Sequence, residues 1–290
     1  MIEIEEHRIR GRGIDLHVVT AGPAAGRPVI LLHGFPDFWY GWRHQIDALA
    51  QRGFRLIMPD QRGYGGSDKP AAIGAYDISQ LSGDVLALMD ELDLPRASLV
   101  GHDFGGGVAW WIAANHPGRV ERLVVLNCPH FAVYRRAHLG LEQLVRSWYV
   151  YGLVVPRLGE MACRAHGFRA LLRLGPGTRT GGMRAEDIPP YCEAWGRPGA
   201  VHGMLAWYRA MIPALLRRFR RTRIAAPTLL LWGKRDEFLA SAMAGRSIAL
   251  CERGRLVMLE DETHWLHWDA PERVNGLIAD WLAAPEEPRG

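Results

Sequence analysis

The residues best suited to chemistry lie in the segment Gly101-His102-Asp103-Phe104-Gly105. An apolar run over residues 97–100 precedes it, and a segment with helical periodicity over 108–114 follows. A strand, a sharp glycine-flanked turn and a helix normally hold a nucleophilic serine, in the motif Gly-x-Ser-x-Gly. Asp103 stands here in the serine position. A carboxylate that attacked an acyl carbon would form a reactive anhydride, so Asp103 is better suited to opening a strained or activated sp³ carbon, which gives an alkyl ester.

Two further residues could complete a catalytic triad with Asp103. Asp236 follows the apolar run 227–232, and His264 follows the run 255–259. Open α/β sheets place their sites at the carboxyl ends of such strands. We expect His264 to activate water and Asp236 to fix the imidazole tautomer and stabilise the imidazolium. Taken singly, Asp236 could instead be a helix N-cap and His264 a surface histidine, but the order nucleophile, acid, histidine favours the triad.

A possible oxyanion hole begins at His33-Gly34-Phe35-Pro36, directly after the apolar run 28–33. A turn at this glycine and proline would point the backbone N–H of Phe35 toward the site. Together with the N–H of Phe104, it would stabilise an oxyanion. An ordinary loop turn is the alternative interpretation of this motif.

Apolar runs of strand length alternate with amphipathic segments along most of the chain. Strands are expected over residues 5–10, 14–21, 28–33, 55–59, 97–101, 123–127, 227–232 and 255–259, and helices over 39–51, 78–92, 105–115 and 271–282. This alternation is typical of a parallel, doubly wound sheet. It stops between 129 and 223, where helical stretches occur at 139–151 and 201–219. We therefore predict an α/β protein with a mostly parallel doubly wound sheet, whose core is 1–128 and 224–290, and an inserted α-helical cap over 129–223.

With these residues in view, the chain resembles the α/β-hydrolase fold proteins and, within them, the bacterial soluble-type epoxide hydrolases. The matching core segments are 33–45, Asp60-Gln-Arg-Gly-Tyr-Gly-Gly-Ser-Asp68, Gly101-His-Asp-Phe-Gly-Gly106 and 264–275, and the matching cap segments are Ser147-Trp-Tyr149 and Trp207-Tyr-Arg209. The resemblance covers nearly the whole chain. It implies a small hydrophobic epoxide and water as substrates, an ester intermediate on Asp103, and neither a metal nor an organic cofactor.

The resemblance also assigns roles to two tyrosines of the cap. Tyr149 and Tyr208 stand where the family holds and protonates the epoxide oxygen. A phenol with an ordinary pKa near ~10 is a hydrogen-bond donor at neutral pH, which suits that role. The alternative is a tyrosine packed in the cap with its hydroxyl at the rim. Tyr151 lies about 200° from Tyr149 around a helix, so only one of these two side chains can face the site.

The expected pocket is apolar and aromatic, which favours hydrophobic or aryl epoxides. Its walls are expected to include Phe35, Trp39, Phe104 and Trp148. The family frequently has tryptophan where this chain has Phe104, and glycine where it has Thr263, but neither departure removes a catalytic group.

Two other functions use the same fold. Haloalkane dehalogenases form the same aspartate ester but typically carry an indole where Phe104 stands. Fluoroacetate-type enzymes carry arginines at the positions of Phe104 and Gly107. A non-catalytic binding protein of this fold usually lacks a triad member, whereas all are present here. These comparisons favour epoxide hydrolysis.

The composition is that of a soluble globular protein, with 48% hydrophobic and 23% charged residues. Arginine supplies almost all of the positive charge, and its densest run, 217–223, has no aromatic stacking platform, so we expect a solvated helix end and no nucleic-acid partner. The four cysteines are widely spaced and fit free thiols in a reducing compartment. No signal peptide or membrane span is visible. We expect a cytoplasmic monomer or homodimer without a membrane partner.

Overall fold

An eight-stranded sheet forms the centre of the computed structural model, which describes residues 2–138, 140–176, 183–215 and 221–285. The strand order is β1-β2-β4-β3-β5-β6-β7-β8. The strands are β1 (Ile4–Arg10), β2 (Asp15–Ala21), β3 (Arg27–Leu32), β4 (Phe54–Pro59), β5 (Ala97–His102), β6 (Val120–Leu126), β7 (Thr228–Gly233) and β8 (Gly254–Leu259). β1 pairs antiparallel with β2, and β2 with β4, whereas all the other pairs are parallel. The predicted α/β fold with a mostly parallel sheet is confirmed.

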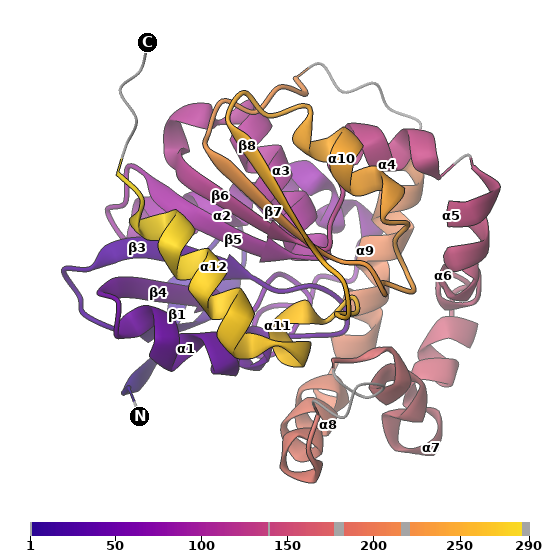
Figure 1. Cartoon of the computed structure of the whole chain (residues 1–290). Helices are drawn as coiled ribbons and strands as arrows, with labels where there is room; N and C mark the ends of the chain where they lie inside the picture. The colour runs from indigo at the N-terminus through magenta and orange to yellow at the C-terminus, as the bar shows by residue number, and fades with distance from the viewer. Residues whose placement is uncertain (1, 139, 177–182, 216–220, 286–290) are drawn as a thin grey trace.

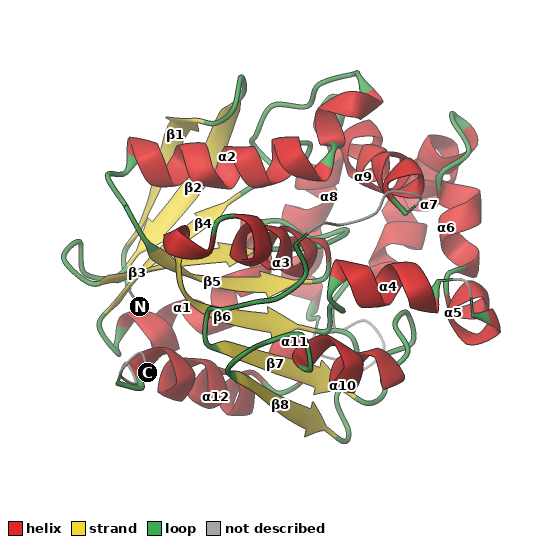
Figure 2. Ribbon diagram, turned by 90° about the horizontal axis from the view of Figure 1, so that it is seen from above, coloured by secondary structure: helices red, strands yellow, loops and turns green. Residues whose placement is uncertain are grey.

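Helices cover both faces of this sheet, as Figure 2 shows. On one face lie α1 (Arg43–Ala50) and α12 (Pro271–Ala283), and on the other lie α2 (Ile78–Glu91), α3 (Phe104–Asn115) and α10 (Ala242–Ile248). Because side chains alternate along a strand, neighbours in β3 enter different cores: Leu31 packs with α1 and α12, and Ile30 with α2 and α3. Burial on both faces explains why these strands have continuous apolar sequences.

In the part of the chain that the structure describes, helices α4 to α9 follow β6 and gather beyond the carboxyl ends of the parallel strands (Figures 1 and 2). They are α4 (Phe131–Ala137), α5 (Leu141–Arg146), α6 (Trp148–Leu153), α7 (Leu158–Leu174), α8 (Ile188–Gly196) and α9 (Ala200–Ala214). The short elements are η1 (Trp39–Trp42), η2 (Ile73–Tyr76), η3 (Pro117–Arg119), η4 (Ala185–Asp187) and α11 (Leu266–Asp269). No helix in the described ranges is long and apolar enough to cross a bilayer. The boundaries of the cap at 129 and 223 stay a prediction.

The cap helices differ from their predicted extents. The single helix expected over 139–151 is two helices, α5 and α6, with a break at Ser147. The Ser147 hydroxyl accepts a hydrogen bond from the Gln143 side chain (3.0 Å), and serine side chains that bond locally weaken regular helix. Residue 139 and the end of the helix expected over 201–219 lie outside the described residues, as does much of the basic run 217–223.

The turn between β5 and α3 depends on close backbone approaches that only glycine permits. A methyl group on Gly105 would collide with the carbonyl oxygen of Leu32 in β3. Gly107 lies on the same helix, but a methyl group there would meet no atom within 4 Å. Gly105 therefore lets α3 begin directly against the sheet. This close packing positions Asp103, the residue at the turn.

We predict that Gly105→Ala destabilises the fold by several kcal/mol, because the backbone of Leu32 cannot move without disturbing the central sheet. Gly107→Ala is the matched control. It should leave the free energy of unfolding unchanged or raise it by up to about 1 kcal/mol, since alanine is the better helix former. Urea unfolding followed by circular dichroism measures both. Equal stability of the two variants would contradict the packing argument.

Candidate active site

Asp103 occupies the turn between β5 and α3 with φ 48° and ψ −121°, a backbone conformation that is unfavourable for residues other than glycine. Strain of this kind persists where the surrounding structure imposes it, and it clusters at active sites. One carboxylate oxygen, Oδ1, accepts a hydrogen bond from the backbone N–H of Phe35 (2.9 Å). The other, Oδ2, lies 3.6 Å from Nε2 of His264. The two oxygens are therefore in different environments.

His264 lies between two carboxylates. Its Nδ1 is 2.8 Å from Oδ2 of Asp236, on the side opposite Asp103. Asp236 and His264 are both almost fully buried. The structure thus brings Asp103, Asp236 and His264 together in the expected order.

Asp236 is held by more groups than the sequence suggested. Its Oδ1 accepts from the backbone N–H groups of Phe238 (2.8 Å) and Leu239 (2.9 Å). Its Oδ2 also accepts from the side-chain amide of Asn127 (2.5 Å), whose own oxygen accepts from the N–H of Gly233. We did not single out Asn127, although a polar residue at the end of the apolar strand β6 was a usable signal. Asn127 therefore links the carboxylate of Asp236 to the end of β7.

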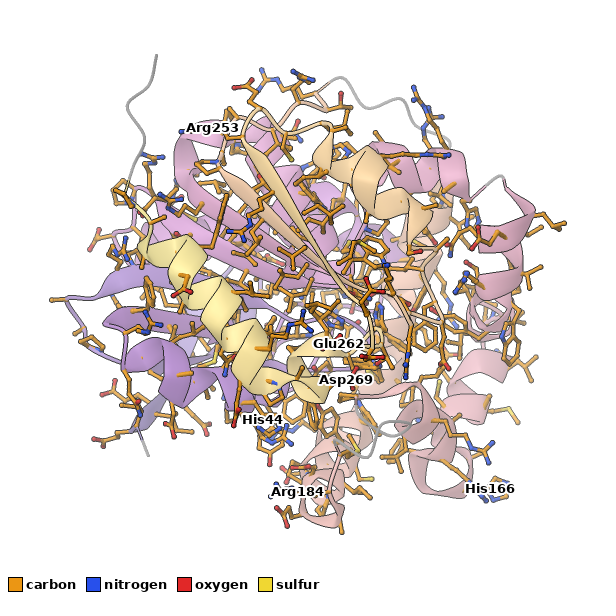
Figure 3. The ribbon with its side chains drawn as sticks, viewed as in Figure 1. His44, His166, Arg184, Arg253, Glu262 and Asp269 are labelled. Atoms are coloured by element: carbon orange, nitrogen blue, oxygen red, sulfur yellow. The ribbon has the colours of Figure 1, made fainter. Side chains whose placement is uncertain are left out.

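Hydrogen bonds between Thr263 and Asp269 hold the loop that carries His264 in place. The hydroxyl of Thr263 donates to the carboxylate of Asp269 (2.6 Å), which also accepts from the N–H of Thr263 (2.8 Å). Glu262, which directly precedes Thr263 and is labelled with Asp269 in Figure 3, forms an ion pair with Arg273 (3.2 Å). The threonine that departs from the family pattern therefore has a structural role here: its side chain anchors the histidine loop.

The charges of the site favour an ion pair. Burial lowers the pKa of His264, but the carboxylates of Asp236 and Asp103 outweigh it and raise that pKa to about 10. Burial raises the pKa of Asp103, but His264 and the N–H of Phe35 reverse the effect and lower it below its ordinary value. The neighbouring His102 behaves oppositely, since burial and then His264 lower its pKa to about 3. These pKa shifts favour a carboxylate on Asp103, an imidazolium on His264 and a neutral His102.

Tyr149 on α6 and Tyr208 on α9 meet above Asp103. Their rings lie edge to face, with centroids 6.4 Å apart. The ring of Tyr208 also packs against Phe35 (5.0 Å) and Phe104 (4.7 Å). Burial, and then the nearby charge of Asp103 for Tyr149, raises the pKa of both phenols. Both hydroxyls therefore remain protonated hydrogen-bond donors at neutral pH.

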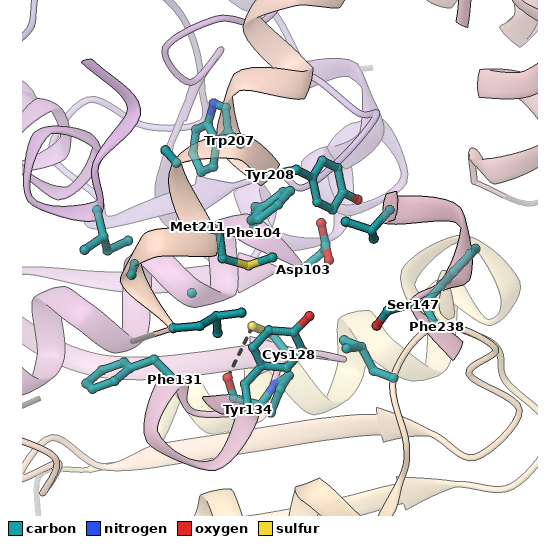
Figure 4. Close-up of a pocket in the computed structure, with 18 of the residues that line it drawn as sticks. Asp103, Phe104, Cys128, Phe131, Tyr134, Ser147, Trp207, Tyr208, Met211 and Phe238 are labelled. Atoms are coloured by element: carbon teal, nitrogen blue, oxygen red, sulfur yellow. Dashed lines mark hydrogen bonds between the residues drawn. The ribbon is translucent and has the colours of Figure 1, made fainter. Parts of the chain in front are cut away.

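A largely apolar cavity extends from Asp103 between the core and the cap (Figure 4). Both tyrosines and Phe104 line it. Aromatic and aliphatic side chains from α3, α4 and α9 complete its walls, including Trp111, Phe131, Trp207 and Met211. Its polar groups away from Asp103 include Gln143, Ser147 and Tyr134. The cavity can hold a hydrophobic molecule against the carboxylate.

Two of the expected pocket residues do not line this cavity. Trp148 is 72% exposed, because it is one residue before Tyr149 and thus turned about 100° away around α6. Trp39 packs beside Phe38 and Tyr40, and it faces a separate surface hollow together with Asp60. The expectation that Trp148 and Trp39 form this wall is wrong.

Phe35 and Tyr151 also lie away from the cavity lining. The ring of Phe35 packs against Tyr208, and its backbone N–H reaches Asp103. Tyr151 is exposed, so of the two tyrosines on α6 it is Tyr149 that faces the cavity.

The sequence analysis missed several residues of the cavity wall. Met211 lies one helical turn after Tyr208, and this spacing could have revealed it. Phe131 and Tyr134 lie on α4, a helix that we did not predict.

Within the described ranges, no group of three or more histidine, cysteine, aspartate or glutamate side chains is arranged to hold a metal ion.

Comparisons with known proteins agree with this geometry. Residues 27–148 match the family model of the alpha/beta hydrolase fold. The chain is 37% identical to the AB hydrolase superfamily protein YfhM of Bacillus subtilis, over 94% of this chain and 96% of the relative. It is also 37% identical to mouse epoxide hydrolase 4, over 97% of this chain and 79% of that protein. The crystal structure of an epoxide hydrolase from Bacillus megaterium in complex with an inhibitor superposes with a TM-score of 0.89 at 27% identity, over 96% of this chain and 100% of that one.

We predict that the imidazole of His264 stays protonated through neutral pH, and nitrogen-15 NMR of its ring can measure this. A raised histidine pKa means that the pairing stabilises the fold fully below the ordinary pKa of 6.5, and that this contribution is lost as the pH rises through about 10. Asp103→Asn removes one of the two carboxylates and should lower the pKa of His264. His102 should stay neutral and serves as the internal control. A wild-type His264 that titrates near 6.5 would refute the ion pair.

Proposed function

The chain belongs to the epoxide hydrolases of the α/β-hydrolase superfamily, which are hydrolases that act on ether bonds, and on this basis we propose how its residues convert an epoxide to a vicinal diol. The proposed route passes through an alkyl ester on Asp103. The observation that carries it is the cavity in which the Asp103 carboxylate and the two phenols of Tyr149 and Tyr208 meet. These groups supply a nucleophile for an epoxide carbon and hydrogen-bond donors for its oxygen.

In the first step, Oδ2 of Asp103 attacks a ring carbon of the epoxide. Oδ1 accepts the hydrogen bond from Phe35 (2.9 Å) and stays at the oxyanion position, so Oδ2, which lies 3.6 Å from Nε2 of His264, is the nucleophile. As the new C–O bond forms, the ring C–O bond breaks and its electrons move to the epoxide oxygen. An alkoxide leaves poorly, so the hydroxyls of Tyr149 and Tyr208 hold this oxygen, and one of them gives it a proton. The products are a hydroxyalkyl ester and a phenolate.

Formation of the ester then changes the protonation of His264. The ester is neutral, so one of the two carboxylates that raise the pKa of His264 is lost. The imidazolium gives its proton, through solvent, to the phenolate. His264 becomes a neutral base, still oriented by Asp236, only after the first step is complete. The order of the two steps is thus enforced by charge.

In the second step, His264 takes a proton from a water molecule, which attacks the ester carbonyl of Asp103. The oxyanion forms on Oδ1, where the N–H of Phe35 already donates. Phe104 is the first residue of α3, where backbone N–H groups have no partner within the helix, and its N–H is the second donor. Collapse expels the diol oxygen, which takes the proton of the attacked carboxyl group. The ion pair between Asp103 and His264 is restored.

The preferred substrates are hydrophobic and aryl epoxides. The cavity wall beyond Asp103 is mostly aromatic and aliphatic, as in Trp111, Phe131 and Met211. An aryl group fills such a wall with favourable edge and face contacts. A small polar epoxide would leave much of this surface uncovered.

We predict that Tyr208→Phe and Tyr149→Phe each lower kcat/KM for styrene oxide by at least about tenfold, and that the double variant loses about a hundredfold or more, because general acid groups contribute about 10²–10⁴-fold. Removing a hydroxyl keeps the ring of Tyr208 packed against Phe35 and Phe104 and the ring of Tyr149 packed against Phe238. Initial rates of diol formation measure the effect.

Tyr151→Phe is the matched control, since this tyrosine lies on the same helix but is exposed. Its kcat/KM should equal that of the wild type. If Tyr149→Phe, Tyr208→Phe and the double variant all hydrolysed styrene oxide at the wild-type rate, the two phenols would have no role in the mechanism. Turnover of a bromoalkane in preference to styrene oxide would instead favour a dehalogenase.

A further inference from the structure

The outer face of α5 and α6 carries apolar side chains in contact with solvent. Leu141 is 76% exposed, Val145 is 61% exposed and Trp148 is 72% exposed, and Leu144 and Tyr151 are exposed beside them. Because residues three or four apart are neighbours on a helix, Leu141 lies on the same side of α5 as Leu144 and Val145, and Trp148 lies on the same side of α6 as Tyr151. Outer helix faces in water are ordinarily polar. We call these five residues the outer stripe.

The inner face of the same helices is already buried against the rest of the protein. Gln143, Ser147, Val150 and Leu153 are buried, and the first three line the cavity. Figure 1 shows α5 and α6 at the edge of the molecule, on the side away from the sheet. The outer stripe is therefore not the core-facing side of an amphipathic pair, and monomeric proteins rarely expose a contiguous apolar patch without using it.

Exposed apolar residues continue past the end of α6, and arginines accompany them. Val155, Leu158 and Met161 are exposed, with the exposed Arg157 and Arg164 beside them in the sequence. The nearby acids are already engaged, since Glu142 pairs with Arg146 (3.3 Å) and Glu160 pairs with Arg209 (2.6 Å). The surroundings of the stripe are therefore cationic.

The exposed apolar side chains and the arginines together indicate which partner can bind the outer stripe. A second copy of the chain seated on the stripe would bring the arginines of both copies together, and like charges repel. An anionic lipid bilayer accommodates both features: leucine, valine and tryptophan enter the boundary between headgroups and acyl chains, and arginine meets the headgroups. Tryptophan and tyrosine also favour that boundary.

We propose that the outer stripe docks the protein reversibly on an anionic bilayer surface. This association lies beyond the reaction proposed above and does not depend on it. It replaces the expectation from composition that the chain has no membrane partner. No spanning helix is involved, since the helices lie flat on the surface by one face.

Co-sedimentation of the full chain with phospholipid vesicles tests this proposal. The protein should pellet with vesicles that contain phosphatidylglycerol, much less with pure phosphatidylcholine, and less at high salt. The double variant Leu141→Glu/Val145→Glu should weaken binding at least about tenfold, since it places charge in the inserted face. Arg157→Gln/Arg164→Gln should weaken binding to the anionic vesicles about tenfold or more.

Ile188→Glu is the matched control, because it replaces an exposed apolar residue of the cap on α8, away from the stripe. It should bind vesicles like the wild type, and circular dichroism checks that every variant is folded. No pelleting with anionic vesicles, or equal pelleting with both lipids, would overturn the proposal. Concentration-dependent dimerisation that the Leu141→Glu/Val145→Glu variant abolishes would overturn it as well, in favour of a second copy.

Discussion

The candidate active site is organised around the buried imidazole of His264, held between the carboxylates of Asp103 (3.6 Å) and Asp236 (2.8 Å). Burying any of these charges alone would be costly, so each is stable only because the others are in place. The strained turn at Asp103, the amide of Asn127 and the hydrogen bonds that hold the His264 loop all serve to keep the three groups together. In the proposed mechanism the same arrangement sets the order of the two steps, because ester formation on Asp103 would remove one of the two charges that hold the proton on His264.

The sequence was most informative where one physical requirement dominated. Continuous apolar runs predicted the parallel strands, because burial on both faces leaves little other choice. Asp103, Asp236 and His264 could then be brought together, because the ends of parallel strands share one edge of a sheet. Tyr149 and Tyr208 came from the family resemblance rather than from periodicity, and the structure places both on the cavity.

The cap was less predictable because its helices have apolar residues on more than one side. Hydrophobic periodicity cannot tell which face of α6 points inward when Trp148, Tyr149 and Tyr151 are all aromatic. The break at Ser147 separates α6 from α5, so periodicity read through residues 139–151 as one helix does not give the rotation of α6. Trp148 was therefore assigned to the cavity, although it lies on the outer stripe. The inner face of α5 and α6 lines the cavity, and their outer face is exposed to solvent.

The central claim is that Asp103 forms a covalent ester that water cleaves at the carboxyl carbon. A single turnover of excess enzyme with styrene oxide in ¹⁸O-water, followed by mass spectrometry of the peptide that contains Asp103, tests it most directly. The mechanism predicts that the label enters the carboxylate of Asp103 and that the diol of the first turnover carries none. Label found only in the diol would mean that water opens the epoxide directly, and it would contradict the account.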